Sequence, residues 1–478
     1  MKSYQQYING EFRDAVSKER FEVINPFTEK VVAMAPKGGA EDAALALEAA
    51  SSAQKAWAAK PCSERAVYLT KMAEAIRANR VMLAETLAEE QAKVMPLAQV
   101  EIDATAAYFD YYAGWSNKYE GEVIQSDRPT ENILLYRQPI GVVVGICPWN
   151  FPFFVMARKV APSILTGCTI ILKPSSDTPN TTFEFAKIIA GIGLPKGVLN
   201  FVSGGGSTLG DALVRSPEVG LITLTGSVET GQRIIAATAE NITKTSLELG
   251  GKAPVIVCAD CDMDLTVKAV VASRVIFSGQ VCNCAERVYV EAPVYDEFME
   301  RMTKAMAAVT YGDPFAKTPP DMSSQINAAQ LDKIAAMVDR AKAEGADVLV
   351  GGKRAENQPS GYFYEPTLLA GCTQDMEIIR KEIFGPALPV VKVDDFDEAI
   401  ELSNDCEYGL TSSIFTSNMN KTMRAINELK FGETYVNREH FEAIQGFHAG
   451  WRKSGIGGAD GKHGLYEYLQ THVAYIQY

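Results

Sequence analysis

Two residues capable of covalent and acid–base chemistry stand in distinctive surroundings. Cys282 lies in Ser278-Gly-Gln-Val-Cys-Asn-Cys-Ala-Glu-Arg287, and Glu248 ends an apolar run in Leu247-Glu-Leu-Gly-Gly-Lys252. A thiolate is a strong nucleophile once its proton is removed. A carboxylate among leucines is costly to bury unless it is paired or protonated. Both residues also have a purely structural explanation. Cys282 can be a small core residue, and Glu248 can form an ion pair with Lys244 or Lys252.

Three further segments place polar groups where a nucleotide or an oxyanion can bind. Thr225-Gly-Ser-Val-Glu-Thr-Gly231 follows a predicted strand and opens a predicted helix with Ser227 as N-cap, and helix N-termini bind pyrophosphates. Lys173 follows another predicted strand, at the sheet edge where ligands bind. Asn150, in Pro148-Trp-Asn-Phe-Pro152, either faces such a site or caps the next helix. Glycine turns and lysines at strand ends also occur for backbone and solvation reasons, so these segments alone leave the function open.

The elements that must position these residues follow a clear rhythm. Short Val/Ile/Leu-rich runs alternate with helical stretches, which predicts a parallel sheet covered by helices on both faces. The predicted strands are 141–146, 169–172, 198–202 and 221–225, and the helical stretches are 153–165, 180–192, 207–214 and 228–241.

The flanking regions predict helices on both sides of this core. Apolar spacing indicates helices at 40–59, 63–91 and 102–119, with a break at Pro96, and further helices at 264–277, 294–311 and 328–344. Residues 121–137 are polar and β-like, typical of an arm. The tail, 464–478, alternates apolar and polar residues and predicts a strand that can add to a neighbouring subunit.

Length and composition limit the classes of function. A chain of 478 residues predicts two or three domains, and 47% hydrophobic with 22% charged residues is the ordinary globular range. The net charge of -13 makes nucleic acid and anionic membranes poor partners. The sequence contains no membrane-length apolar stretch and no signal peptide pattern, and its 9 cysteines predict reduced thiols in the cytoplasm. We expect no metal site, because the four histidines and the cysteines lack ligand spacing.

Six segments, taken together and in order, resemble the NAD(P)-dependent aldehyde dehydrogenase superfamily over essentially the whole chain. They are Pro148-Trp-Asn-Phe-Pro152, Lys173-Pro-Ser, Thr225-Gly-Ser, Leu247-Glu-Leu-Gly-Gly-Lys252, Gly279-Gln-Val-Cys282 and Glu382-Ile-Phe-Gly-Pro386. The resemblance implies an α/β fold with three parts: a variant Rossmann cofactor domain lacking G-x-G-x-x-G, an α/β catalytic domain and a small β oligomerisation arm. The implied boundaries are 1–120 and 138–249 for NAD(P) binding, 250–459 for catalysis, and 121–137 with 460–478 for the arm of a homotetramer.

The resemblance also implies residue roles. Cys282 attacks the aldehyde, Asn150 and the Cys282 backbone N–H hold the oxyanion, Lys159 supports that region, and Glu248 activates the water that hydrolyses the thioester. The implied cofactor contacts are Trp149, Lys173, Ser176, Gly226, Ser227, Glu382 and Phe384. Many NAD-preferring members carry Glu where this chain has Ser176, so we expect NAD and consider NADP possible.

The implied substrate is a small hydroxyaldehyde. The stretches 119–129 and 445–458 are similar to those of bacterial members that oxidise lactaldehyde and glycolaldehyde. Arg158, Asn283, Arg438 and His448 are the candidate substrate contacts, and His440 lies in the same region. An Arg- and His-lined pocket suits a hydroxyl or a carboxylate beside the aldehyde, so an acidic semialdehyde such as succinate semialdehyde is the alternative.

Two other classes of function stay open behind these. A CoA-acylating dehydrogenase would pass the thioester to CoA, but such enzymes usually lack the water-activating Glu that Glu248 matches. A non-catalytic structural protein on the same fold is disfavoured by the intact set of Cys282, Glu248, Asn150 and Lys173.

Overall fold

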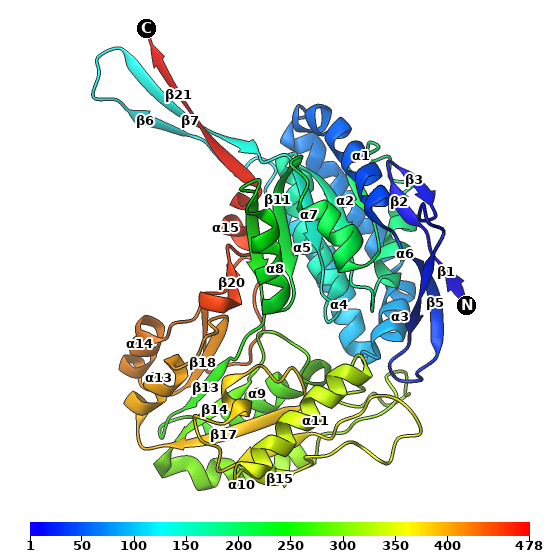
Figure 1. Cartoon of the computed structure of the whole chain (residues 1–478). Coiled ribbons are helices and arrows are strands. Elements are labelled where there is room, and N and C mark those ends of the chain that lie inside the picture. The colour runs from blue at the N-terminus through cyan, green and yellow to red at the C-terminus, as the bar shows by residue number, and fades with distance from the viewer.

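The computed structural model describes residues 1–478 and consists of two α/β bodies and a protruding β arm (Figure 1). The first body is built on an eight-stranded sheet in the order β20-β12-β11-β8-β9-β10-β2-β3. Its five central strands are parallel: β8 (Val142–Ile146), β9 (Thr169–Lys173), β10 (Leu199–Phe201), β11 (Val219–Thr225) and β12 (Lys244–Glu248). The antiparallel edges are β2 (Gln6–Ile8), β3 (Glu11–Arg13) and β20 (Gly455–Ile456).

Helices cover both faces of this sheet, as the alternating pattern predicts. They are α1 (Ala40–Ala58), α2 (Cys62–Ala78), α3 (Arg80–Gln91), α4 (Met95–Ala113), α5 (Pro152–Thr166), α6 (Asn180–Ile189), a π-helical turn (Gly206–Gly210) with α7 (Asp211–Val214), and α8 (Val228–Thr238). A small sheet of β1 (Lys2–Ser3), β4 (Arg20–Ile24) and β5 (Val31–Pro36) lies at the N-terminus.

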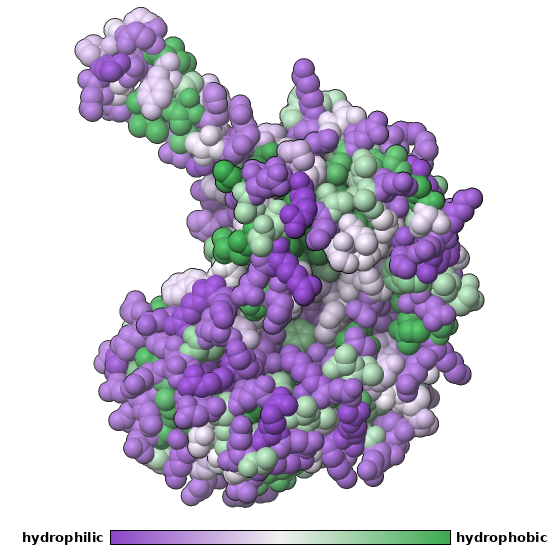
Figure 2. All heavy atoms as spheres, in the orientation of Figure 1, coloured by the Kyte–Doolittle hydropathy of each residue, from purple (hydrophilic) through white to green (hydrophobic).

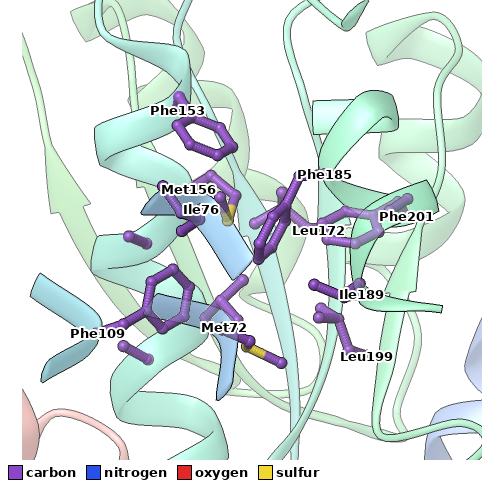
Figure 3. Close-up of a cluster of buried hydrophobic side chains, with 14 of the residues drawn as sticks. Met72, Ile76, Phe109, Phe153, Met156, Leu172, Phe185, Ile189, Leu199 and Phe201 are labelled. Atoms are coloured by element: carbon purple, nitrogen blue, oxygen red, sulfur yellow. The ribbon is translucent and has the colours of Figure 1, made fainter. Parts of the chain in front are cut away.

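The main core of the first body lies between the sheet and the α2–α4–α5–α6 layer. Figure 3 shows Phe153, Phe185 and Phe201 converging there, with ring centroids 5.5 Å apart for Phe153–Phe185 and 6.2 Å for Phe185–Phe201. Met72 and Met156 fill the spaces beside the rings. This packing fixes α5 against the sheet, and α5 carries two of the predicted site residues.

The second body is a seven-stranded sheet in the order β15-β16-β17-β14-β13-β18-β19, parallel except for the edge strand β15. Its strands are β13 (Pro254–Val257), β14 (Arg287–Glu291), β15 (Asp347–Val350), β16 (Thr367–Ala370), β17 (Ala387–Val393), β18 (Thr411–Phe415) and β19 (Glu433–Val436). Its helices are α9 (Met263–Val275), α10 (Tyr295–Ala307), α11 (Ala328–Ala343), α12 (Glu377–Arg380), α13 (Phe396–Asn404) and α14 (Met419–Glu428), with short 3₁₀ turns at Ile276–Gly279, Ala292–Val294 and Arg452–Ser454.

The arm is a three-stranded antiparallel sheet of β6 (Glu122–Gln125), β7 (Glu131–Pro139) and β21 (Leu469–Gln477). It extends away from the first body, with apolar side chains on its surface (Figures 1 and 2). The predicted tail strand therefore exists, but in this chain it pairs along its length with the chain's own β7.

Four sequence predictions need correction. The single helix expected over 63–91 is two helices, because the chain bends at Asn79 between α2 and α3. Pro96 does not break a helix but begins α4, since proline is tolerated in a first turn. The segment Gly455–Ile456, assigned to the catalytic domain, pairs with β12 in the first sheet. Residues 461–466, assigned to the arm, form α15 and contact α5. None of the helices is both long and apolar enough to cross a lipid bilayer.

Candidate active site

The sulfur-bearing loop of Cys282 lies where two cavities meet. One, the polar cleft, has a volume of about 1050 Å³ and is lined by the ends of β8, β11 and β12 together with α11. The other, the apolar pocket, has a volume of about 940 Å³ and lies between α4, α5 and the loop at 440–444. Cys282, Asn150 and Thr225 line both cavities. A molecule in each cavity therefore reaches the same thiol.

Parallel-sheet topology explains why distant motifs meet here. Asn150 follows β8, Thr225 ends β11, and Glu248 ends β12, all at the carboxyl edge of neighbouring parallel strands. That edge is where ligands bind in open α/β sheets. Cys282 arrives from the second body, just after a turn in which Phe277, Ser278 and Gly279 all have positive φ.

Close backbone contacts hold the Cys282 loop. A Cβ on Gly251 would lie 2.6 Å from the Cys282 carbonyl oxygen, and one on Gly279 would lie 2.2 Å from the Gly385 carbonyl oxygen. Glycine is therefore required at both positions, because a side chain would displace the loop that carries the thiol. The Cys282 backbone N–H donates to no backbone carbonyl and is free for an oxyanion.

A buried lysine organises the turn that carries Asn150. Lys93 Nζ donates to the Asn150 carbonyl at 2.6 Å and to Glu101 at 2.5 Å, and it lies 3.7 Å from the Phe151 ring centroid. Glu101 in turn accepts from the backbone N–H groups at the start of α5. The Asn150 side-chain amide donates to the Gln280 carbonyl at 3.0 Å, which ties it to the Cys282 loop.

Glu248 is fully buried, yet its surroundings favour its charged form. Burial alone would raise its pKa, but the positive charges of Arg158, Lys159 and His448 together lower the pKa below its ordinary value. Thr225 Oγ1 donates to the carboxylate at 2.8 Å. Burial lowers the pKa of Lys159, and Lys159 Nζ donates to Thr223 and Thr225 at 3.0 Å each. Glu248 is thus a carboxylate able to accept a proton in the cleft that Cys282 also lines.

His448 is buried and is not among the residues that line either cavity. Its Nδ1 is 2.6 Å from Glu433 Oε1. Burial opposes the imidazolium, but the Glu433 carboxylate and this hydrogen bond raise the pKa of His448 well above its ordinary value. The sequence predicted a substrate contact for His448, and that assignment stays a prediction.

Most predicted cofactor residues gather in the polar cleft. Trp149, Gly226, Ser227, Glu382 and Phe384 line it, with the Trp149 and Phe384 rings edge-on at 5.3 Å. Ser227 caps α8 by accepting from the Thr230 N–H at 3.2 Å, so the helix N-terminus faces the cleft.

Glu382 is an acidic group of the cleft, whereas the remaining candidates, Lys173 and Ser176, are not among its lining residues. Glu382 accepts from the Gly251 N–H at 2.7 Å, and burial raises its pKa to about 7. Lys173 is buried, and Ser176 lines a hollow with Asp177 and Tyr362, whereas the adjacent Ser175 lines the cleft. Lys333 and Gln330, which sequence reasoning missed, reach the cleft from α11.

Some of the candidate substrate residues line the apolar pocket and others do not. Arg158 and Asn283 line the apolar pocket, as does His440. Arg158 Nη2 donates to Asp460 at 2.6 Å and to Glu442 at 2.9 Å, and Asn283 donates to Glu442 at 2.6 Å. Arg438 lies on the surface instead, because its guanidinium binds Glu439 and the Phe441 carbonyl. Glu442 had no sequence signal, since no motif surrounds it.

Comparison with known proteins adds independent information. The model of the aldehyde dehydrogenase family matches residues 12–474. The chain is 54% identical over 474 residues to lactaldehyde dehydrogenase of Escherichia coli (strain K12), covering 99% of this chain and 98% of the relative. A crystal structure of lactaldehyde dehydrogenase from Escherichia coli superposes with a TM-score of 0.98 over 100% of this chain and 99% of the other.

Two more distant relatives are known with different cofactors. A structure of betaine aldehyde dehydrogenase from Staphylococcus aureus in complex with NAD⁺ is 34% identical, with a TM-score of 0.97 over 100% of this chain and 95% of the other. D-glyceraldehyde dehydrogenase (NADP(+)) of Picrophilus torridus is 38% identical over 99% of this chain and 96% of the relative.

Proposed function

Because the chain belongs to the aldehyde dehydrogenase family, we propose that it oxidises a small uncharged hydroxyaldehyde, such as lactaldehyde or glycolaldehyde, to its carboxylic acid with NAD. The proposal is supported first by the thiol at the junction of two cavities. One cavity suits a dinucleotide and the other a small organic substrate.

The polar cleft has features that fit NAD(P). The free N–H groups at the start of α8 suit a pyrophosphate, and Gly226 allows close approach of the backbone. Trp149 and Phe384 offer flat apolar surfaces for a ring, and Glu382 is an acceptor for ribose hydroxyls. When bound, the cofactor supplies a hydride acceptor. Ser176 carries no charge that would repel a 2′-phosphate, so NADP is the alternative cofactor.

Each of the protein residues has its own role in the reaction. The Cys282 thiolate adds to the aldehyde carbon, and the oxyanion so formed is held by the Asn150 amide and the Cys282 backbone N–H. Loss of hydride from that carbon leaves a thioester on Cys282. Glu248 takes a proton from water, which attacks the thioester and releases the carboxylic acid and the thiol. The balance is aldehyde, NAD⁺ and water to acid, NADH and a proton.

The charge state of the apolar pocket carries the substrate assignment. Arg158 is the cation that a carboxylate-bearing semialdehyde would need, but Asp460 and Glu442 already bind it. An acidic substrate would therefore have to displace a buried carboxylate, which is unfavourable. An uncharged hydroxyaldehyde makes no such demand, and Glu442 can accept its hydroxyl hydrogen. The 54% identity with a lactaldehyde dehydrogenase agrees with this choice.

The test is a comparison of kcat/KM for lactaldehyde, glycolaldehyde and succinate semialdehyde, each with NAD and with NADP. We expect the hydroxyaldehydes with NAD to give the highest values. A preference for succinate semialdehyde would contradict the substrate assignment and would require that Arg158 exchanges its carboxylate partners for the substrate. Addition of CoA should leave the product a free acid, since Glu248 is present to activate water.

A further inference from the structure

His440 presents an unusual group to the apolar pocket. It lines this pocket together with Ile276, Cys282 and Phe441, and only 7% of the residue is exposed. Its Nε2 atom is buried and has no hydrogen-bond partner. An unpartnered buried polar atom is costly, and such atoms are rare in native structures without a reason.

The hydrogen bonds of the other ring nitrogen, Nδ1, indicate which of the two nitrogens carries the hydrogen. Nδ1 lies 2.8 Å from Ser273 Oγ, and the same oxygen accepts from the Ala285 backbone N–H at 2.9 Å. The Ser273 hydroxyl has no acceptor other than Nδ1, so its hydrogen points to Nδ1. Nδ1 is therefore an acceptor, and in the neutral ring the hydrogen is on Nε2.

The ring is neutral. Burial, with smaller contributions from the nearby charges of Arg274 and Arg438, lowers the pKa of His440 to about 3. The ring is also held in place, since the Tyr435 ring packs against it at a centroid distance of 5.2 Å. Nε2–H is thus a fixed, uncharged donor without a protein partner, on a residue that lines the pocket.

Other polar groups of the pocket are already engaged. Arg158 binds Asp460 and Glu442, and Asn283 donates to Glu442. A substrate with an oxygen beside its aldehyde would give the His440 donor its missing acceptor, whereas an alkyl aldehyde would leave the donor unpaired. A site built around a substrate hydroxyl discriminates strongly against analogues that lack it.

We propose that His440 Nε2–H donates a hydrogen bond to the hydroxyl oxygen of the substrate and so sets the preference for hydroxyaldehydes over alkyl aldehydes. This assignment rests on the proposed function and goes beyond it by naming the specificity-determining group. Lactaldehyde and propionaldehyde are the matched pair, because they differ only by that hydroxyl.

The experiment measures kcat/KM for both aldehydes with NAD in the wild type, His440→Phe and His440→Gln. Phe keeps a ring but has no donor, and the Gln amide keeps a donor N–H at similar reach. We expect His440→Phe to lower the lactaldehyde-to-propionaldehyde ratio about tenfold, the usual value of one neutral hydrogen bond, and His440→Gln to recover most of it. Phe441→Leu is the control, since it alters the same wall without removing a donor and should change both aldehydes by a similar factor.

The outcomes separate this inference from the proposed function. If His440→Phe changes both aldehydes equally while the wild type prefers lactaldehyde, the role of His440 is wrong and the proposed function stands. If the wild type oxidises both equally well, no hydroxyl recognition exists and both the inference and the substrate assignment fail. If His440→Gln loses discrimination as completely as His440→Phe, ring packing rather than the donor is responsible.

Discussion

Glu248 is a buried carboxylate that the charges of Arg158, Lys159 and His448 keep ionised, with a pKa lowered despite burial. It is needed only after hydride loss, for hydrolysis. We therefore predict that Glu248→Gln releases about one NADH per subunit in a rapid first turnover and then slows about 10²-fold or more. Stopped-flow absorbance of NADH measures both phases. Cys282→Ser should show neither phase while still binding NAD, and an unchanged steady rate in Glu248→Gln would remove it from the mechanism.

Arg158 on α5 binds two carboxylates from near the C-terminus, and its loss would leave the buried Asp460 and the half-buried Glu442 without their cation. The Arg158 side chain is 5% exposed and that of Asp460 is 1% exposed. We predict that Arg158→Met lowers the free energy of unfolding by about 3–5 kcal/mol, because breaking one side of a buried pair leaves an uncompensated charge. Thermal unfolding measures this. Adding Asp460→Asn to the variant should recover part of the loss.

A surface pair provides the control for this prediction. Arg340 and Glu377 form an ion pair in which both side chains are at least 39% exposed. Exposed pairs contribute little, so Arg340→Met should shift the unfolding temperature only slightly. If both arginine variants lost the same stability, the argument from buried charge would be wrong.

At the scale of elements, Lys93 connects the end of α3 with the turn before α5. It binds Glu101 and the Asn150 carbonyl, and it lies against the Phe151 and Phe277 rings. We predict that Lys93→Met lowers kcat about tenfold with a smaller change in the aldehyde KM, because Asn150 would be misplaced where the oxyanion forms. Steady-state kinetics distinguish the two parameters. Lys93→Met with Glu101→Gln should be the more stable background, and a change confined to KM would contradict the positioning role.

A second element contact predicts a pH dependence of stability. Glu90 on α3 accepts from the N–H groups of Asn180 and Thr181 at the start of α6, and burial raises its pKa to about 7. A raised folded-state pKa means that the folded protein binds the proton more tightly. Its contribution is therefore complete below the ordinary pKa of 4.5 and is lost as the pH rises through about 7.

The variant Glu90→Gln tests this sign. It should gain stability relative to the wild type as the pH rises from the ordinary pKa of 4.5 to about 7, by up to about 1.4 kcal/mol per pH unit, and the difference should level off above about pH 7. Thermal unfolding between about pH 4.5 and pH 8 measures the difference. Glu85→Gln, on the exposed face of the same helix, is the charge control and should track the wild type. A difference between Glu90→Gln and the wild type that is constant with pH would contradict the prediction.

The same contacts show which parts of the site could be predicted from the sequence and which could not. The strands that end near Asn150, Thr225 and Glu248 were predictable, because apolar runs reveal buried parallel strands and topology then brings their carboxyl ends together. The residues that form ion pairs with the site residues were not predictable from the sequence. Asp460 lies 302 residues from Arg158, and no local period connects them. Pro96 was misread because a proline can either end a helix or occupy its first turn.

At the scale of the whole molecule, the arm is the part left without an intramolecular partner. Its outer strands β6 and β21 have unpaired edges, and Val473 and Tyr475 on β21 are 40% and 69% exposed. By register, Tyr475, Ile133 and Ile124 lie across one face of the sheet. Exposed apolar sheet edges are templates for pairing with another chain. We propose that the arm joins copies of this chain into a homotetramer.

The prediction is that Val473→Asp with Tyr475→Asp converts the tetramer to smaller species without unfolding the two bodies. Two carboxylates on one apolar face oppose its burial against another subunit. Light scattering coupled to size exclusion measures the mass against the 52.0 kDa chain, and circular dichroism reports the fold. Val81→Asp, an equally drastic change at a 59% exposed valine on α3, is the control and should keep the wild-type mass. An arm variant that remains tetrameric would place the interface elsewhere, since nothing else in the chain projects so far from the two bodies (Figure 1).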